Sequence, residues 1–272
     1  MKLRTLGCIF LASCGILKAE TAFKAYADFD YTSEYNFRGI KKTQNAFDPN
    51  VGLDAFIDQL NVGELVVDSF VEAKMTAVEP VTKSFGDEIN FYAAYGWNLK
   101  HVTADLGATY YWYPQAHSGR GQTEHTLEAG PSLTWTNDIL DPSLEFYYDF
   151  RLRSETVQLS LTHRFPLSHP RASANGSRNP ADEKNGLWLE VSGTLGNVSS
   201  RNQTPDLSGS RIVDSYSYVG ADFELPYYFD DDFTVYVGAD FSGTRNLAGV
   251  GGPNAPQTRD NAWFTCGATQ RW

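Results

Sequence analysis

Histidine and serine residues that could support hydrolysis are few and loosely spaced. His117, Ser118 and His125 share one polar stretch, His163 falls on the apolar face of a predicted strand, and His169 lies in a segment rich in Pro, Ser and Asn. A lipid hydrolase would need a nucleophile and a base within hydrogen-bond reach of each other. Because histidines in polar connections are usually solvated, we predict no catalytic residues, and a lipid-modifying enzyme remains the weaker alternative.

Three other motifs could bind ions or phosphate. Residues 248–253 are Gly-rich but lack a following Lys and helix, which predicts a flexible loop. The adjacent acids 230–232 predict a solvated turn, because calcium needs about 6–8 oxygen ligands. Cys8 and Cys14 fall in the N-terminal leader and Cys266 stands alone, so neither a disulfide framework nor a cysteine metal site is expected. We therefore predict no metal and no cofactor.

Carboxylates are the groups most able to act on a solute. The 272-residue chain has 33 Asp and Glu against 22 Lys and Arg, a formal net charge of −11. Its basic residues are nowhere clustered, so nucleic acid is not an expected partner. Many of the acids occupy every second position of a run whose other positions are apolar.

The run at residues 23–37 shows this alternation most clearly. Phe23, Ala25, Ala27, Phe29 and Tyr31 share one face, and ionic or polar residues occupy the other. Such a period of two, sustained well beyond the roughly 5–6 residues of an ordinary strand, means that one face meets an apolar medium and the other meets water.

Comparable runs recur about 12 times, and most approach the roughly 9–11 residues that cross a bilayer at about 45° tilt. After the leader, no stretch nears the roughly 18 apolar residues of a membrane helix. We predict an all-β fold, an antiparallel transmembrane up-and-down β-barrel of about 12 strands in a bacterial outer membrane. A secreted β-sandwich is the alternative. The expected strands are at residues 23–37, 50–58, 64–75, 88–98, 102–112, 127–135, 144–153, 157–165, 187–195, 219–225, 233–241 and 264–272.

Connection lengths favour the barrel, because outer-membrane barrels have short periplasmic turns and longer outer loops. Short turns are expected at residues 58–63, 98–101, 137–142 and 226–232, and long loops at 39–49, 79–87, 114–125, 198–210 and 243–260. A tight outer hairpin between the seventh and eighth strands breaks this rule. It leaves residues 166–185 as a flexible periplasmic loop, unless one strand there is miscounted.

Aromatic residues are expected at both membrane interfaces. Pro131 lacks an N–H, and a closed barrel has no free edge, so we expect a bulge near Gly130 and Pro131. The predicted interface aromatics are Tyr35, Phe37, Trp97, Trp112, Trp135, Phe241 and Trp272.

The first residues predict export. Lys2 and Arg4 precede an apolar stretch from Leu6 to Leu17, which ends in a small-residue cleavage site at Ala19. We divide the chain into a signal peptide, residues 1–19, and a single barrel domain, residues 20–272. Residues 11–14 also resemble a lipobox, which leaves lipidation of Cys14 as an alternative.

The polar faces of the strands define a predicted pore lining in which acids outnumber bases. Such a lumen attracts cations, because low-dielectric walls focus the field inside it. The arginines can instead pair with neighbouring carboxylates and stiffen the wall. The predicted lining is Asp28, Asp30, Glu34, Arg38, Asp54, Asp68, Glu72, Lys74, Glu88, Asp105, Glu128, Glu145, Asp149, Arg151, Arg153, Arg164, Glu190, Asp222, Glu224 and Asp240.

The end of the first run carries a more specific motif. Ser33, Tyr35, Phe37, Arg38 and Gly39 form Ser-x-Tyr-x-Phe-Arg-Gly. This segment resembles the opening of the porins of the TorF (Gcw-type) family, and residues 45–55 match the continuation. The specific likeness covers about the first 40 residues after the leader, and the 166–185 insertion departs from it. The resemblance implies an outer-membrane barrel with a pore function.

A barrel of about 12 strands falls between small, filled barrels and wide porins. We therefore expect a pore for passive diffusion of small solutes or ions, with a preference for cations. A closed barrel that binds ligands or mediates adhesion through its outer loops is the alternative. Expected partners are the outer-membrane bilayer with its lipopolysaccharide, small solutes, and the barrel-assembly machinery, which would contact the last strand ending at Trp272.

Overall fold

The computed structural model describes most of the chain after residue 20. The described residues are 21–38, 40–62, 65–80, 88–99, 101–114, 124–135, 140–168, 185–200, 215–230, 232–245 and 259–272. The expected signal peptide with Cys14, the Gly-rich motif, His117, Ser118 and His169 lie outside these ranges, as does the side chain of Asp68. No helix in the described ranges is long and apolar enough to span a membrane.

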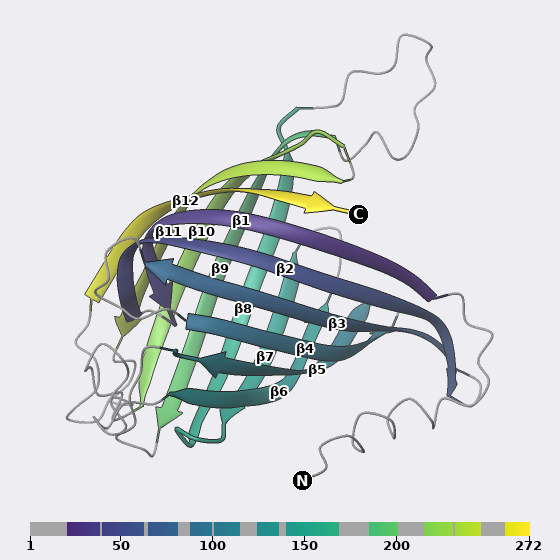
Figure 1. Cartoon of the computed structure of the whole chain (residues 1–272), viewed down its shortest axis with the longest axis horizontal. Coiled ribbons are helices and arrows are strands. Elements are labelled where there is room, and N and C mark those ends of the chain that lie inside the picture. Colours follow the sequence, from purple (N-terminus) through teal and green to yellow (C-terminus); the bar gives the residue numbers. More distant parts are fainter. Residues whose placement is uncertain are drawn as a thin grey trace.

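Twelve antiparallel strands form one closed barrel, which confirms the predicted fold and strand number (Figure 1). Each strand pairs with its neighbours in sequence, and β1 pairs with β12 to close the ring. The strands are β1 Thr21–Phe37, β2 Ile40–Val62, β3 Leu65–Pro80, β4 Glu88–Leu99, β5 Val102–Trp112, β6 His125–Trp135, β7 Asp141–Asp149, β8 Ser154–Pro166, β9 Gly186–Ser200, β10 Tyr216–Tyr228, β11 Phe233–Arg245 and β12 Arg259–Arg271.

Large apolar side chains cover the outside of this wall. Phe29, Leu106, Leu133 and Val237 are between 50% and 57% exposed, although each lies within a regular strand. Their sequence neighbours point to the opposite face, because side chains of a strand alternate. An apolar exterior of this extent is stable in lipid, and the closed hydrogen-bond ring leaves no open sheet edge there.

The start of β1 meets the C-terminus at one end of the barrel, which we call the terminal end; the opposite end is the distal end. The Trp272 N–H donates to the Ala25 carbonyl at 2.8 Å, and the Ala25 N–H donates to the Trp272 carbonyl at 3.2 Å. The last residue therefore extends the seam between β1 and β12. Its side chain is 68% exposed, as expected for an interface aromatic.

The expected loop at residues 39–49 is wrong. β2 begins at Ile40, and its pairing with β1 continues to Phe37 opposite Ile40. The polar composition of this stretch suggested a loop, but its backbone remains paired as a long hairpin.

The expected bulge at Gly130 and Pro131 is also wrong. Across β5 and β6, Gly107 pairs with Gly130 and Leu106 with Pro131 without a register shift. On the other side, pairing with β7 is absent at these two positions and resumes in the same register at Ser132. The missing proline N–H is therefore accommodated by a gap in one ladder rather than by an extra residue.

The strand count around residues 166–185 is now clear. β7 and β8 are joined at the distal end by the four-residue turn 150–153, as predicted, and β8 and β9 are joined at the terminal end by residues 167–185. No strand is missing between β8 and β9 in the described residues, although residues 169–184 lie outside them.

Candidate functional site in the barrel interior

The tip of the β1–β2 hairpin leaves the wall near Tyr35. The β1–β2 register shifts between Tyr35 and Asn36, which is the signature of a β-bulge. A bulge bends a strand and redirects its side chains. In Figure 1 the purple and blue ends of β1 and β2 bend away from the other strands at the left of the picture.

The contacts of the hairpin tip define its position in the barrel. Tyr35 donates to Glu88 Oε1 on β4 at 3.3 Å, and the ring of Phe37 lies 6.1 Å from that of Tyr111 on β5. On the far side, Ile40 packs against a cluster of Val198, Tyr216 and Tyr218 on β9 and β10. These contacts reach strands on opposite walls, so the tip crosses the barrel interior.

The prediction of a membrane-interface position is therefore wrong for two of the aromatic residues. Tyr35 and Phe37 lie inside the barrel, because the end of the hairpin leaves the wall and turns into the interior, where it contacts β4 and β5. Trp112, Trp135, Phe241 and Trp272 are exposed on the outside, at 39% or more. Trp97 is half-buried near the end of β4 and packs against Tyr95, with ring centroids 4.9 Å apart.

Arg38 forms the end of the tip. Its Nη2 lies 2.8 Å from Glu128 Oε1 on β6, and the two side chains are 14% and 4% exposed. The guanidinium carbon lies 4.6 Å from the centre of the Phe37 ring and 5.4 Å from that of Tyr147 on β7. In a closed ring of twelve strands, β7 is opposite β1, so Arg38 reaches the far wall.

The interior carboxylates differ in burial between the two ends of the barrel. Interior residues at the distal half are nearly inaccessible, with Glu88 and Glu128 at 4%, Thr126 at 5% and Thr156 at 0% exposure. Toward the terminal end, Glu72, Asp105 and Glu145 are only half-buried, and Arg164 is 60% exposed. The hairpin tip lies against the buried residues of the distal half, whereas these carboxylates of the terminal half keep partial exposure, although Thr234 and Pro226 at that end are buried.

Tyrosine hydroxyls hold many of the interior carboxylates. Tyr111 donates to Glu128 Oε2 at 3.0 Å, Tyr147 to Glu145 Oε2 at 2.6 Å, and Tyr26 to Glu72 Oε1 at 3.4 Å, and Tyr236 donates to Asp30. These tyrosines were not predicted as a group of hydrogen-bond donors. Their position on the polar face of the alternation was the available signal.

Other predicted lining residues also make wall contacts. Thr269 donates to Asp28 at 2.9 Å, Ser132 donates to Asp105, and Arg164 Nε lies 2.7 Å from Glu190 Oε2. The Arg164–Glu190 pair is largely exposed and contributes less than about 1 kcal/mol. Glu34 accepts a hydrogen bond from Asn36 in the tip, and the half-buried Asp54, Lys74, Asp222, Glu224 and Asp240 lie on strands β2, β3, β10 and β11.

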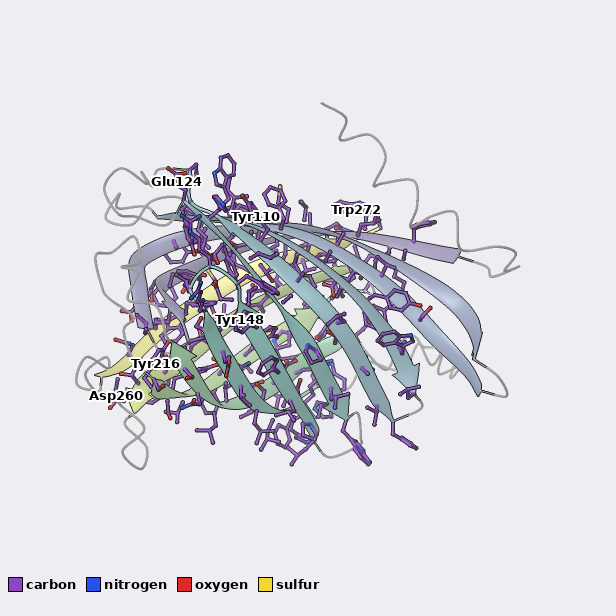
Figure 2. All side chains as sticks on the ribbon, turned by 90° about the horizontal axis from the view of Figure 1, so that it is seen from below. Tyr110, Glu124, Tyr148, Tyr216, Asp260 and Trp272 are labelled. Atoms are coloured by element: carbon purple, nitrogen blue, oxygen red, sulfur yellow. The ribbon has the colours of Figure 1, made fainter. Side chains whose placement is uncertain are left out.

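Arg151 and Arg153 are not lining residues. Both are exposed in the 150–153 turn, and Arg151 Nη1 lies 3.3 Å from His125 Nε2. His125 in turn stacks on Tyr110, which is 38% exposed on the outer face. Figure 2 labels Tyr110 and Glu124 near this end of the barrel, with Trp272 away from it. The prediction extended the seventh strand to residue 153, whereas β7 ends at Asp149.

Asp149 has a structural role beside this turn. Its Oδ1 accepts hydrogen bonds from the Thr126 hydroxyl at 2.6 Å and from the N–H groups of Arg151 and Leu152 at 2.9 and 2.7 Å. Similarly, Asp230 Oδ1 accepts from the N–H groups of Asp232 and Phe233, which confirms the turn predicted for residues 230–232.

Replacing Asp149 with Ala is expected to lower the free energy of unfolding by about 1–3 kcal/mol, because buried donors lose their acceptor. Urea unfolding of the protein refolded in lipid vesicles measures the change. Glu155→Ala, at an exposed position of β8, is the control and should unfold at the wild-type urea concentration. Equal stability of the two variants would contradict the role of Asp149.

His163, the remaining described histidine of the hydrolase hypothesis, packs on Phe165 with ring centroids 4.2 Å apart. His163 and His125 are on different strands, β8 and β6, and neither is hydrogen-bonded to a serine among the described contacts. The described residues contain no group of three or more His, Cys, Asp or Glu side chains arranged to hold a metal ion.

These features define a class: a closed twelve-stranded barrel with an apolar exterior and a charged interior crossed by its own first hairpin. The family model described as "Bacterial protein of unknown function (Gcw_chp)" matches residues 17–176, more than half of the chain, and the chain belongs to this family. The resemblance noted from the Ser33–Gly39 motif is thus confirmed.

Comparison with curated proteins found no match. Among solved structures, the chain is similar to the NanC porin, with 11% identity, a TM-score of 0.46, and coverage of 92% of this chain and 99% of the porin. It is also similar to the COG4313 outer membrane channel from Pseudomonas putida F1, with 10% identity, a TM-score of 0.43, and coverage of 93% and 95%. The chain is similar as well to LpxR from Salmonella typhimurium, with 9% identity, a TM-score of 0.43, and coverage of 92% of this chain and 99% of LpxR.

Proposed function

We propose that this protein is an outer-membrane pore for small solutes, with a preference for cations, and that the β1–β2 hairpin tip restricts its distal half. The observation that carries the proposal is the half-buried set of carboxylates in the terminal half of the interior. In this proposal the solute passes these carboxylates once the tip has moved aside.

The physical basis is the charge of the accessible interior. Glu72, Asp105 and Glu145 are half-buried rather than buried, whereas the bases are Lys74, which is also half-buried, and Arg164, which is paired with Glu190. Fixed negative charge within low-dielectric walls raises the local concentration of cations and lowers that of anions. Twelve strands are also intermediate between a filled barrel and a wide aqueous channel, which suits a narrow, charge-selective path.

Neutralising two of these carboxylates tests the preference. We expect Glu72→Gln combined with Glu145→Gln to move the reversal potential of the refolded protein toward zero in a KCl gradient across a planar bilayer. Fewer fixed charges discriminate less between K⁺ and Cl⁻. Glu155→Gln, on the exposed outer face of β8, is the matched control and should keep the wild-type potential. An unchanged potential in the double variant would rule out selection by these carboxylates.

The same recording separates the alternatives. Folded wild-type protein without conductance steps, together with tip variants that also fail to conduct, would leave a closed barrel whose outer loops bind ligands or cells. A lipid-modifying enzyme would instead require loss of lipid release on replacing His125, which here contacts Arg151 and Tyr110. In the proposed setting, the partners are the lipid bilayer, lipopolysaccharide, and the barrel-assembly machinery at the C-terminal strand ending in Trp272.

A further inference from the structure

The site that holds Arg38 is built mainly by the barrel wall. Glu128 on β6 supplies the carboxylate, Tyr111 on β5 fixes that carboxylate with a 3.0 Å hydrogen bond, and Tyr147 on β7 supplies a ring. We call Tyr111, Glu128 and Tyr147 the wall box. The occupant, Arg38, comes from a different element, the tip of the hairpin.

The chemistry of the wall box is specific for a guanidinium group. A guanidinium is planar, donates hydrogen bonds to a carboxylate in a fixed fork, and stacks on aromatic rings. An ammonium or alkali cation is more strongly hydrated and does not combine these contacts. Glu128 is 4% exposed, so an occupant must leave water to reach it, which favours the weakly hydrated guanidinium.

We infer that the wall box is a binding site for small solutes bearing a guanidinium group, which displace Arg38 and thereby release the hairpin tip. This inference rests on the proposed pore function and names the ligand that opens it. Displacement leaves Glu128 paired with an equivalent cation, so the carboxylate is never buried without a partner.

The backbone of the tip does not depend on the wall box. Arg38 has a φ of 51°, a left-handed conformation that is uncommon for any residue other than Gly, Asn or Asp. Phe37 pairs with Ile40, so this conformation belongs to the tight turn between β1 and β2. The turn can therefore persist when a solute takes over the contact with Glu128 and the tip leaves the wall.

The tether sets the solute concentration that is needed. Arg38 is covalently linked to the barrel, and short tethers give effective concentrations in about the millimolar range. A free guanidinium solute must therefore be supplied at millimolar concentrations or above to compete. This is well below the concentrations at which guanidinium unfolds proteins.

The experiment records conductance of the refolded, full barrel in a planar bilayer, with guanidinium chloride added at about 10 mM to a KCl background. We expect the open fraction of the wild-type protein to rise, and equal concentrations of sodium or tetramethylammonium chloride to leave it unchanged. The variant Arg38→Asn, which lacks the guanidinium, should be open already and should show no further opening.

A second readout follows the solute in the vacated site. In Arg38→Asn, guanidinium bound to the wall box should cause brief current blocks, and these should disappear in Arg38→Asn combined with Glu128→Gln. Arg153→Asn is the matched control, because Arg153 has the same residue type and a φ of 50° in the exposed β7–β8 turn. It should respond to guanidinium as the wild type does.

The outcomes distinguish this inference from the proposed function. If Arg38→Asn conducts more than the wild type but guanidinium neither opens the wild type nor blocks the variant, the ligand assignment is wrong and the hairpin-restricted pore stands. If neither the wild type nor Arg38→Asn conducts although both are folded, the pore itself is wrong. Equal opening by tetramethylammonium would overturn the specificity for guanidinium.

Discussion

Replacing Arg38 with Asn is expected to raise the open fraction of the pore by at least about tenfold. The tip is held on the far wall by the 2.8 Å contact between Arg38 and Glu128 and by the Tyr147 ring, whose centre lies 5.4 Å from the guanidinium carbon. Removing one partner of a buried ion pair costs about 3–5 kcal/mol, because the other charge is left uncompensated. A loss of only about 1.4 kcal/mol of holding energy already gives the tenfold change.

Asn at position 38 removes the positive charge without disturbing the backbone conformation of the turn. Asn tolerates the left-handed conformation that Arg38 adopts, so the turn itself is retained. The tip of the variant no longer neutralises Glu128. Water can hydrate this carboxylate only if the tip leaves the wall, so the unpaired charge favours departure of the tip. The current would then rise without loss of the barrel.

Single-channel recording of the wild type, Arg38→Asn and Arg153→Asn at equal protein amounts checks this prediction. The Arg153 control should match the wild type, because its side chain is exposed in a turn. If Arg38→Asn shows the same open fraction as the wild type, the ion pair does not hold the pore closed. Intact refolding, shown by resistance to unfolding in detergent on a gel, is required of all three proteins.

Replacing Gly130 with Ala is expected to destabilise the barrel by about 3 kcal/mol or to prevent its refolding. A β-carbon at Gly130 would overlap the carbonyl oxygen of Phe146 on β7. The obstacle is backbone, which cannot turn aside as a flexible side chain could. β6 and β7 would have to separate beside Pro131, where their ladder already lacks pairing.

Gly193→Ala is the matched control for this change. Gly193 lies within β9, and a β-carbon there meets no atom within 4 Å. We expect its stability to remain within about 0.5 kcal/mol of the wild type. Urea unfolding followed by tryptophan fluorescence measures both variants, and equal urea midpoints would show that β6 and β7 can accommodate the added atom.

The amino-acid sequence by itself determined the wall of this protein. The alternation at residues such as Phe29 and Asp30 repeats with a period of two, and this local pattern fixes which face meets lipid wherever a strand lies in the wall. It correctly predicted an antiparallel barrel of about twelve strands and the exposed Trp135 and Trp272. The motif ending in Arg38 and Gly39 also predicted the family.

Only the tertiary structure decided where that motif lies. A bulge between β1 and β2, at the register shift between Tyr35 and Asn36, accompanies the inward bend of the hairpin end, and no local period reveals such a bend. The position of Arg38 depends on Glu128, Tyr147 and the Val198–Tyr218 cluster, which come from strands far along the chain. Local alternation is set within each strand, whereas the filling of the interior depends on which distant side chains the closed barrel brings together.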